Sequence, residues 1–156
     1  CVDYGCAKGF LVHALRILGC DAYGEDISEY AVENCHPSVK PYITLPNDKK
    51  YDLLICKDVL EHVKVDDIPT VLNIFRDKAD QFFFTIPLGD DDRFRIREYE
   101  VDITHVTKKD EEWWVNMFES YGFKLKKFSY PFGSIKEKWI GPYPYGNGFF
   151  VLSKKE

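Results

Sequence analysis

Two glycines, Gly5 and Gly9, bracket a short turn between an apolar segment at 1–4 and a segment of helical spacing at 10–18. Glycine accepts a positive φ and lets a ligand approach the backbone closely. The free N–H groups at the start of the following helix would point at that ligand. The turn therefore predicts a ligand-binding loop, and two plain turn glycines are the alternative interpretation.

An acidic residue, Asp26, follows this loop by about 20 residues, where the predicted strand 21–27 ends. A carboxylate in that place can accept hydrogen bonds from both hydroxyls of a ribose. The loop reads G-x-x-x-G, which matches neither the dinucleotide pattern G-x-G-x-x-G nor a Walker A loop. The loop and Asp26 together predict a site for an adenosine-like nucleoside. A simple helix cap is the alternative role for Asp26.

The elements that would position these residues alternate along the chain as strands and helices. Strands are predicted at 1–4, 21–27, 41–43, 51–57, 81–86, 123–130 and 148–153, and helices at 10–18, 28–35, 59–63, 68–77 and 107–120. This alternation predicts an α/β fold, a Rossmann-like open sheet of about seven strands with helices on both faces.

The last two predicted strands are joined only by the loop 131–147. No helical crossover fits there, so a mostly parallel sheet with an antiparallel last strand is expected. Thr107, followed by Asp110 three residues on, resembles a capping box that opens the helix running to Ser120.

The composition suits a single domain over residues 1–156, with 45% hydrophobic and 30% charged residues. The net charge of −5 argues against bulk attraction to nucleic acid or an anionic membrane, and there is no apolar run of about 18 residues. The five cysteines form no C-x-x-C pair and indicate reduced thiols in a cytoplasmic protein. The chain opens on Cys1-Val2-Asp3, which we interpret as the end of a strand, so further residues are expected upstream.

Several segments resemble, in the right order, the motifs of the class I S-adenosylmethionine-dependent methyltransferases, and in particular small-molecule members of the type 11 and type 23 kind. The segment Asp3-Tyr4-Gly5-Cys6-Ala7-Lys8-Gly9 resembles their D-x-G-C-G-x-G loop. The later segments that match are 24–28, 51–55, 58–63, 83–87, 104–107 and 121–123. Two features depart from the pattern. Ala7 replaces the middle glycine, and 44–46 lacks the acidic residue often found after the third strand.

The resemblance implies that S-adenosylmethionine is the cofactor and S-adenosylhomocysteine the product. The residues that it implies for cofactor binding surround the loop and the ends of the second and fourth strands. They are Asp3, Gly5, Cys6, Ala7, Gly9, Asp26, Ile27, Lys57, Asp58 and Val59.

An oxygen acceptor of a methyl group usually needs a base or a metal to remove its proton. Asp58, Glu61 and His62 have the spacing i, i+3, i+4, which predicts one shared helix face, and His105 lies in a loop that could cover it. Glu61, His62 and His105 are therefore the candidate catalytic residues. All four resemble the metal site of small-RNA 2′-O-methyltransferases and ubiquinone-pathway O-methyltransferases, so a divalent metal is a second hypothesis. An N-terminal helix cap is the alternative role for the two carboxylates.

Two segments are expected to form the acceptor pocket, 88–106 and 130–147. The first contains Arg93, Arg95 and Arg97, which would share one face of an extended segment and bind an anionic group. The alternative is a solvated loop edge. The second is rich in aromatic side chains, which could line a pocket or fill the core beneath the loop.

The resemblance implies a methyltransferase acting on a small-molecule acceptor, through an oxygen of a sugar or similar metabolite, which the arginines would allow to be anionic. An RNA 2′-O- or protein methyltransferase with a divalent metal is one alternative, and the acidic net charge argues against nucleic acid. A catalytically silent module that only binds S-adenosylmethionine is the other.

Overall fold

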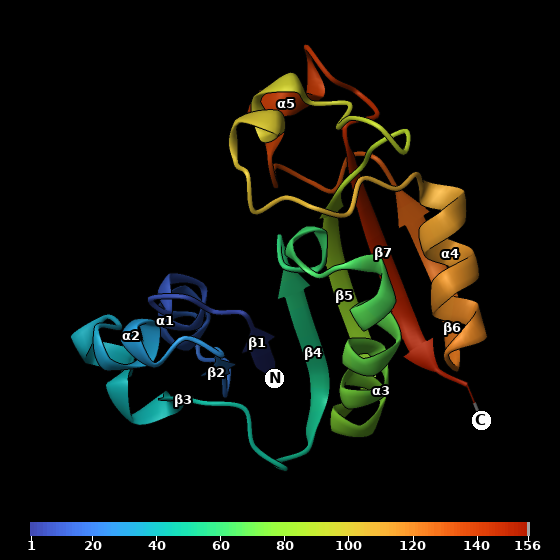
Figure 1. The fold of residues 1–156 in the computed structure, drawn as a ribbon. Helices are drawn as coiled ribbons and strands as arrows, with labels where there is room; N and C mark the ends of the chain where they lie inside the picture. Colours follow the sequence, from blue (N-terminus) through green and yellow to red (C-terminus); the bar gives the residue numbers. More distant parts are fainter. Residues whose placement is uncertain (156) are drawn as a thin grey trace.

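Seven strands form one sheet in the computed structural model, which describes residues 1–155. The strand order is β3-β2-β1-β4-β5-β7-β6 (Figure 1). The strands are β1 (Val2–Tyr4), β2 (Tyr23–Glu25), β3 (Ile43–Thr44), β4 (Tyr51–Lys57), β5 (Ala79–Pro87), β6 (Phe123–Ser129) and β7 (Asn147–Lys154). The pairs from β3 to β5 are parallel, and β7 runs antiparallel to both β5 and β6. The predicted sheet is therefore confirmed.

The helices follow the expected crossovers. They are α1 (Phe10–Ile17), α2 (Glu29–Glu33), α3 (Ile68–Lys78), α4 (Glu111–Ser120) and the one-turn α5 (Glu137–Ile140), with 3₁₀ turns at Pro37–Tyr42, Leu60–His62, Val65–Asp67 and Arg97–Val101. From the central pair of strands, α1 leads outward to β2 and α3 leads outward to β5 on the other side. Because such crossovers are right-handed, α1 and α3 lie on opposite faces of the sheet. None of the helices in residues 1–155 has the length and apolar character that a membrane-spanning helix needs.

The larger apolar core lies between the sheet and the pair α3 and α4. Alternate residues of the central strands point into it, among them Leu54, Phe82 and Phe150, and all three are fully buried. Phe75 of α3 and Phe118 of α4 meet these strand residues from the helical side. A smaller apolar cluster packs α1 against the segment after α2. This arrangement holds the carboxyl ends of the two central strands, β1 and β4, next to each other.

The predicted starts of the fourth helix and of the third strand are wrong. Helix α4 is capped by Asp110, whose carboxylate accepts the Trp113 N–H at 2.8 Å, and not by Thr107. Thr107 is fully buried instead and donates its hydroxyl to the Val63 carbonyl at 2.5 Å, which fastens the preceding loop to the chain after β4. The third strand is only Ile43–Thr44, because two prolines shape Pro37–Tyr42 as a 3₁₀ helix.

Candidate functional site

The glycine-bracketed loop has three residues in the left-handed region, Gly5 at φ 78°, Ala7 at φ 48° and Gly9 at φ 75°. The N–H groups of Gly5 and Cys6 donate to the carbonyl of Glu25, which ties the loop to β2. A side chain at Gly5 would collide with Val59, so only glycine lets Val59 pack this closely against the loop. Backbone conformation and close approach therefore both require the bracketing glycines, and Ala7 tolerates a conformation that costs an L residue about 1 kcal/mol.

Asp26 lies beside this loop, as predicted. Its Oδ2 accepts the Ala7 N–H at 2.8 Å and its Oδ1 accepts the Ser28 N–H at 2.9 Å. Each carboxylate oxygen has a second lone pair, so the group can accept further hydrogen bonds from a ligand. The neighbouring Glu25 is fully buried and forms an ion pair with Lys78 at 2.8 Å. Asp26 is thus the acidic group at the end of β2 that a ligand can reach.

Two cavities meet at Gly5 and contain most of the predicted cofactor-binding residues. One of about 280 Å³ is lined by Asp26, Ile27, Asp58 and Val59 among others, and one of about 160 Å³ by Asp3, Cys6, Lys57 and two residues of α1. Together they reach the size of small-molecule sites, about 300–1,000 Å³. Ala7 and Gly9 line neither cavity; Ala7 contacts Asp26, and Gly9 packs close to Val39 and Ile43.

Asp3 lies at the end of β1 and lines the smaller cavity, with only 5% of its surface exposed. Burial raises the pKa of Asp3 to about 7, with the Asp26 charge adding to the rise and Lys57 opposing it. Burial also raises the pKa of the Cys6 thiol to about 12, so this cysteine is a wall of the loop and not a nucleophile. The smaller cavity therefore offers a carboxyl group that a cationic ligand would ionise.

Asp58 does not share a helix face with Glu61 and His62, so that prediction is wrong. The backbone N–H of Asp58 donates to the carbonyl of Thr85 in β5. Asp58 has a φ of 56° and lies before the 3₁₀ turn Leu60–His62. Because Asp58 lies before the turn in a left-handed conformation, its side chain leaves in another direction. The Asp58 carboxylate pairs with Lys57 at 2.5 Å and with Lys136.

Glu61, His62 and His105 do converge, as predicted. One oxygen or nitrogen atom from each lies within 4.8 Å of the others. Glu61 is 1% exposed, and neither carboxylate oxygen accepts a well-formed hydrogen bond within residues 1–155. Burial and the Asp58 charge raise the pKa of Glu61 to about 8, although its own backbone N–H and Lys136 oppose the rise. A buried carboxyl group without a partner is costly, which marks this position as built for a ligand or a proton.

The hydrogen bonds around the two imidazoles fix their tautomers. His105 Nδ1 lies 2.8 Å from the carbonyl of Tyr99, and a carbonyl only accepts, so Nδ1 carries the proton. His62 Nδ1 lies 2.8 Å from the Thr104 hydroxyl, which gives its own proton to Asp102 at 2.6 Å. His62 Nδ1 must therefore donate as well. Both rings therefore keep a lone pair on Nε2. That of His62 is free for a proton or a metal, whereas His105 Nε2 lies 3.6 Å from the Asp102 carboxylate.

The structure adds Lys136, which sequence reasoning missed. Its side chain is about 10% exposed, and its ammonium group donates to Asp58, to the Tyr99 hydroxyl at 3.1 Å and to Asn147 Oδ1 at 2.9 Å. Lys136 has φ 58° and directly precedes α5. It joins the segment before β7 to the end of β4. No pattern in the loop sequence singles it out, because two of its partners, Asp58 and Tyr99, come from distant parts of the chain.

The predicted acceptor segments lie beyond the carboxyl ends of β4 and β5, at the top of Figure 1. Arg95 is held by Asp90 at 3.0 Å and Glu111 at 2.9 Å, so it fastens the loop to α4. Arg93 and Arg97 are exposed and line a cavity of about 480 Å³. Only these two arginines match the predicted anion-binding role.

The aromatic residues of the second segment divide in the same way. The Trp139 ring packs against Tyr99 and Tyr143, with ring centroids 5.8 and 6.0 Å apart. Tyr145 is 61% exposed and contacts Tyr130. Trp139 therefore belongs to the packing around Lys136, whereas Tyr145 presents its ring to solvent.

A family model described as a methyltransferase domain matches residues 1–127. A search of curated protein sequences gives no match. Many solved structures share the fold, among them three methyltransferases. The first is a SAM-dependent methyltransferase from Archaeoglobus fulgidus, at 16% identity and a TM-score of 0.72, covering 99% of this chain and 85% of that chain. The second is a TehB-like SAM-dependent methyltransferase from Corynebacterium glutamicum, at 14% identity and a TM-score of 0.69, covering 99% of this chain and 79% of that chain. The third is magnesium protoporphyrin IX methyltransferase (ChlM) from Synechocystis, with bound SAH, at 17% identity and a TM-score of 0.71, covering 99% of this chain and 73% of that chain.

Proposed function

The chain belongs to the class I S-adenosylmethionine-dependent methyltransferases, and we propose that it methylates an oxygen of a small-molecule acceptor such as a sugar. The proposal of oxygen as the acceptor atom rests on the convergence of Glu61, His62 and His105 next to the larger of the two cavities. An oxygen acceptor must lose a proton, whereas a neutral amine acceptor needs no base to expose its lone pair. The free Nε2 lone pair of His62 in this cluster supplies the proton acceptor.

We propose that the cofactor spans the two cavities that meet at Gly5. The fit rests on the two cavities that adjoin at Gly5 and on the buried carboxyl group of Asp3. In this arrangement Asp26 accepts from the ribose hydroxyls, and Ile27 and Val59 supply apolar walls for the adenine. Asp3 and Lys57 face the smaller cavity and suit the amino and carboxylate groups of the cofactor.

The cofactor supplies an activated methyl group, so the protein's contribution is placement of the acceptor and removal of its proton. His62 is the proposed base, because its ring lines the larger cavity and its Nε2 lone pair is free. Burial and the nearby His105 lower the pKa of His62, which keeps the ring neutral and able to take a proton at pH 7. Thr104 holds Nδ1 and so orients the ring.

Release of S-adenosylhomocysteine tests the proposed acceptor. The protein would be incubated with S-adenosylmethionine and two panels, hydroxyl compounds such as monosaccharides and matched primary amines. Turnover is expected on the hydroxyl panel, and the His62→Gln variant should lose about 100-fold or more of it while keeping cofactor affinity. Turnover on amines that His62→Gln leaves unchanged would contradict the oxygen acceptor.

As an alternative to His62 acting as a free base, we propose that Glu61, His62 and His105 hold a divalent cation, which would occupy the Nε2 lone pair of His62. Metal-bound histidines commonly donate their second ring nitrogen to a carbonyl or similar oxygen, which matches the partners of both rings here. The ligand set of one carboxylate and two imidazoles admits Zn²⁺ or Mn²⁺. Asp58 is left out of this set, because its carboxylate is paired with two lysines.

Metal content and thermal stability test this second proposal without an activity assay. Purified protein should bind about one equivalent of added Zn²⁺ or Mn²⁺ and melt at a higher temperature with it. The His105→Asn variant should lose both effects, whereas His13→Asn, on another imidazole in α1, should keep them. Equal metal binding by the two variants would contradict the site.

A further inference from the structure

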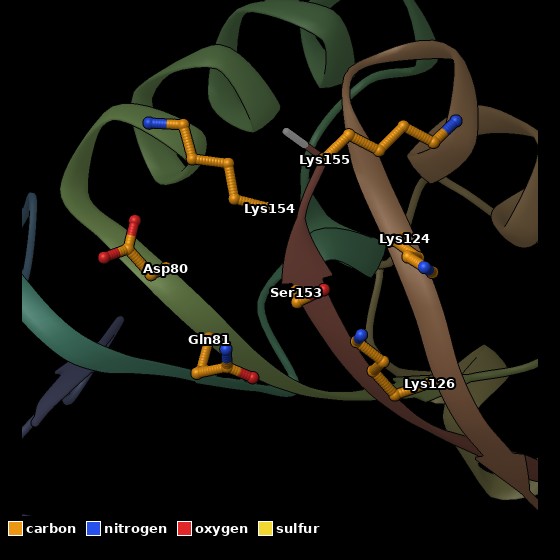
Figure 2. Close-up of a pocket in the computed structure, with 7 residues that line it drawn as sticks. All are labelled: Asp80, Gln81, Lys124, Lys126, Ser153, Lys154 and Lys155. Atoms are coloured by element: carbon orange, nitrogen blue, oxygen red, sulfur yellow. The ribbon is translucent and has the colours of Figure 1, made fainter.

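A cavity of about 740 Å³ opens at the end of the sheet opposite to the candidate site (Figure 2). It is lined by Asp80 and Gln81 at the amino end of β5, by Lys124 and Lys126 of β6, and by the three residues 153–155 at the end of β7. The methyl-transfer site lies at the carboxyl ends of β1 and β4. The cavity is therefore separate from the proposed cofactor and acceptor sites.

One row of neighbouring strand residues explains why this surface is polar. Gln81, Ser153 and Lys124 pair across β5, β7 and β6, so they share one face of the sheet. The next row, which includes Phe82 and Leu152, points to the opposite face and belongs to the core under α3 and α4. Gln81 and Lys124 are exposed on this face and Ser153 lies buried between them, so the three strands β5, β7 and β6 present polar side chains in this row.

The charge of the cavity is the opposite of the charge of the chain. Four lysines, at 124, 126, 154 and 155, against the single carboxylate of Asp80 give its lining a net charge of +3, while the whole chain carries −5. Within residues 1–155, none of these lysines has a carboxylate within the 4.0 Å of an ion pair, although Lys155 donates to the Glu119 carbonyl. Their charges are therefore left to attract an anion.

Protection of the sheet edge explains only part of this cluster. Lysines on an edge strand discourage pairing with another sheet, and β6 is the edge strand that carries Lys124 and Lys126. Lys154 lies on β7, an interior strand, where edge protection has no purpose. In Figure 2, Lys154 and Lys155 diverge from the end of β7, Lys154 to the side of Asp80. Lys154 pairs with Phe123 and so lies on the face of the sheet opposite to Lys124, which means that the lysines flank the end of the sheet from both faces instead of following one edge.

We propose that this lysine pocket binds an oligophosphate, a ligand with several phosphate groups in series. Lysine binds phosphate as a flexible point charge, and several lysines around one hollow favour a ligand with several charges over a single phosphate. The residues that line the pocket include no aromatic ring on which a base could stack, so the phosphates themselves are recognised. The pocket is independent of the proposed methyl transfer and would persist if that function were wrong.

Titration calorimetry with inorganic tripolyphosphate tests the pocket. Tripolyphosphate should bind at least tenfold more tightly than inorganic phosphate, and its affinity should fall by about tenfold or more between about 50 and 200 mM salt. The double variant Lys124→Gln/Lys154→Gln should weaken binding by about tenfold, because it halves the cationic lining. The control Lys64→Gln/Lys138→Gln removes two exposed lysines outside this lining and should have no such effect.

Two further ligands identify the source of the phosphates. A nucleoside triphosphate that binds as tightly as tripolyphosphate assigns the pocket to a free small ligand, and a homopolymeric RNA that binds more tightly assigns it to a nucleic-acid backbone. In either case the Lys124→Gln/Lys154→Gln variant should lose the binding. Absence of saturable tripolyphosphate binding at about 50 mM salt, or an equal loss in the control variant, would overturn the proposal.

Discussion

The Asp3→Asn substitution gives the sharpest prediction about the cofactor site. Asp3 is 5% exposed and lines the smaller cavity, and burial raises its pKa to about 7. The proposed ligand group there is the ammonium of the cofactor's methionine part, which would lower that pKa on binding. Binding should therefore require the ionised carboxylate and release a proton wherever the free protein holds one.

The magnitude follows from the raised pKa. With a pKa of about 7, roughly half of the free protein is ionised at pH 7 and only about 3% at pH 5.5. If only the ionised form binds, the apparent Kd for S-adenosylhomocysteine should rise about 15-fold between these two pH values. The Asn variant has no proton to lose, so its weaker binding should be nearly independent of pH over this range.

Calorimetry in two buffers of different ionisation enthalpy measures both effects, because proton release changes the apparent enthalpy with the buffer. At pH 6 close to one proton per cofactor is expected from the wild-type protein, and the Asn variant should release fewer. A pH-independent Kd for the wild-type protein, or equal proton release from both proteins, would refute this account of Asp3.

Stability provides the control for folding. A carboxyl group whose pKa is raised from 3.8 in the unfolded chain to about 7 in the folded protein destabilises the fold as pH rises between these values. Asp3→Asn removes that penalty and should increase the free energy of unfolding above pH 7, by at most about 4 kcal/mol. A variant that binds less cofactor and yet unfolds at a higher temperature cannot have lost binding through misfolding.

Three further substitutions test the structural account. Ala7→Gly removes a left-handed alanine and should raise the free energy of unfolding by about 1 kcal/mol in urea denaturation; no gain would mean that Ala7 carries no strain. Lys78→Met leaves the fully buried Glu25 without its partner and should cost about 3–5 kcal/mol in the same assay, whereas a cost below about 1 kcal/mol would show that the pair is dispensable. Lys136→Met removes three hydrogen bonds and should increase amide exchange about tenfold or more at 131–146; unchanged exchange there would rule out Lys136 as the tie to β4.

Most of the fold could be predicted because its signals are local. The apolar run of β4, Tyr51–Lys57, and the helical spacing that begins at Phe10 are properties of neighbouring residues. The antiparallel β7 followed from the absence of a helical crossover in a short loop. The cap of α4 is Asp110, but the local sequence could not exclude Thr107 as the cap. Thr107 is occupied by a hydrogen bond to Val63, which comes from a distant part of the chain.

The candidate site could be predicted only where its residues belong to a motif. Gly5 and Asp26 stand at spacings set by a strand, a loop and a helix, so their proximity follows from the fold. Asp58 was misplaced because the spacing i, i+3, i+4 assumes a helix, whereas Asp58 has a left-handed φ of 56° and only a 3₁₀ turn follows it. Lys136 and the Glu25–Lys78 pair join residues more than 50 positions apart, and no local pattern carries that information.

Binding of S-adenosylhomocysteine, measured by calorimetry at about pH 7.5, tests the central claim most directly. The account predicts saturable binding of one equivalent by the wild-type protein, and an affinity at least about tenfold lower for Asp26→Ala, which removes the carboxylate beside the loop. Glu29→Ala, a neighbouring exposed carboxylate in α2, should bind as the wild-type protein does. No binding by the folded wild-type protein, or equal binding by all three proteins, would contradict a cofactor site built on Gly5 and Asp26.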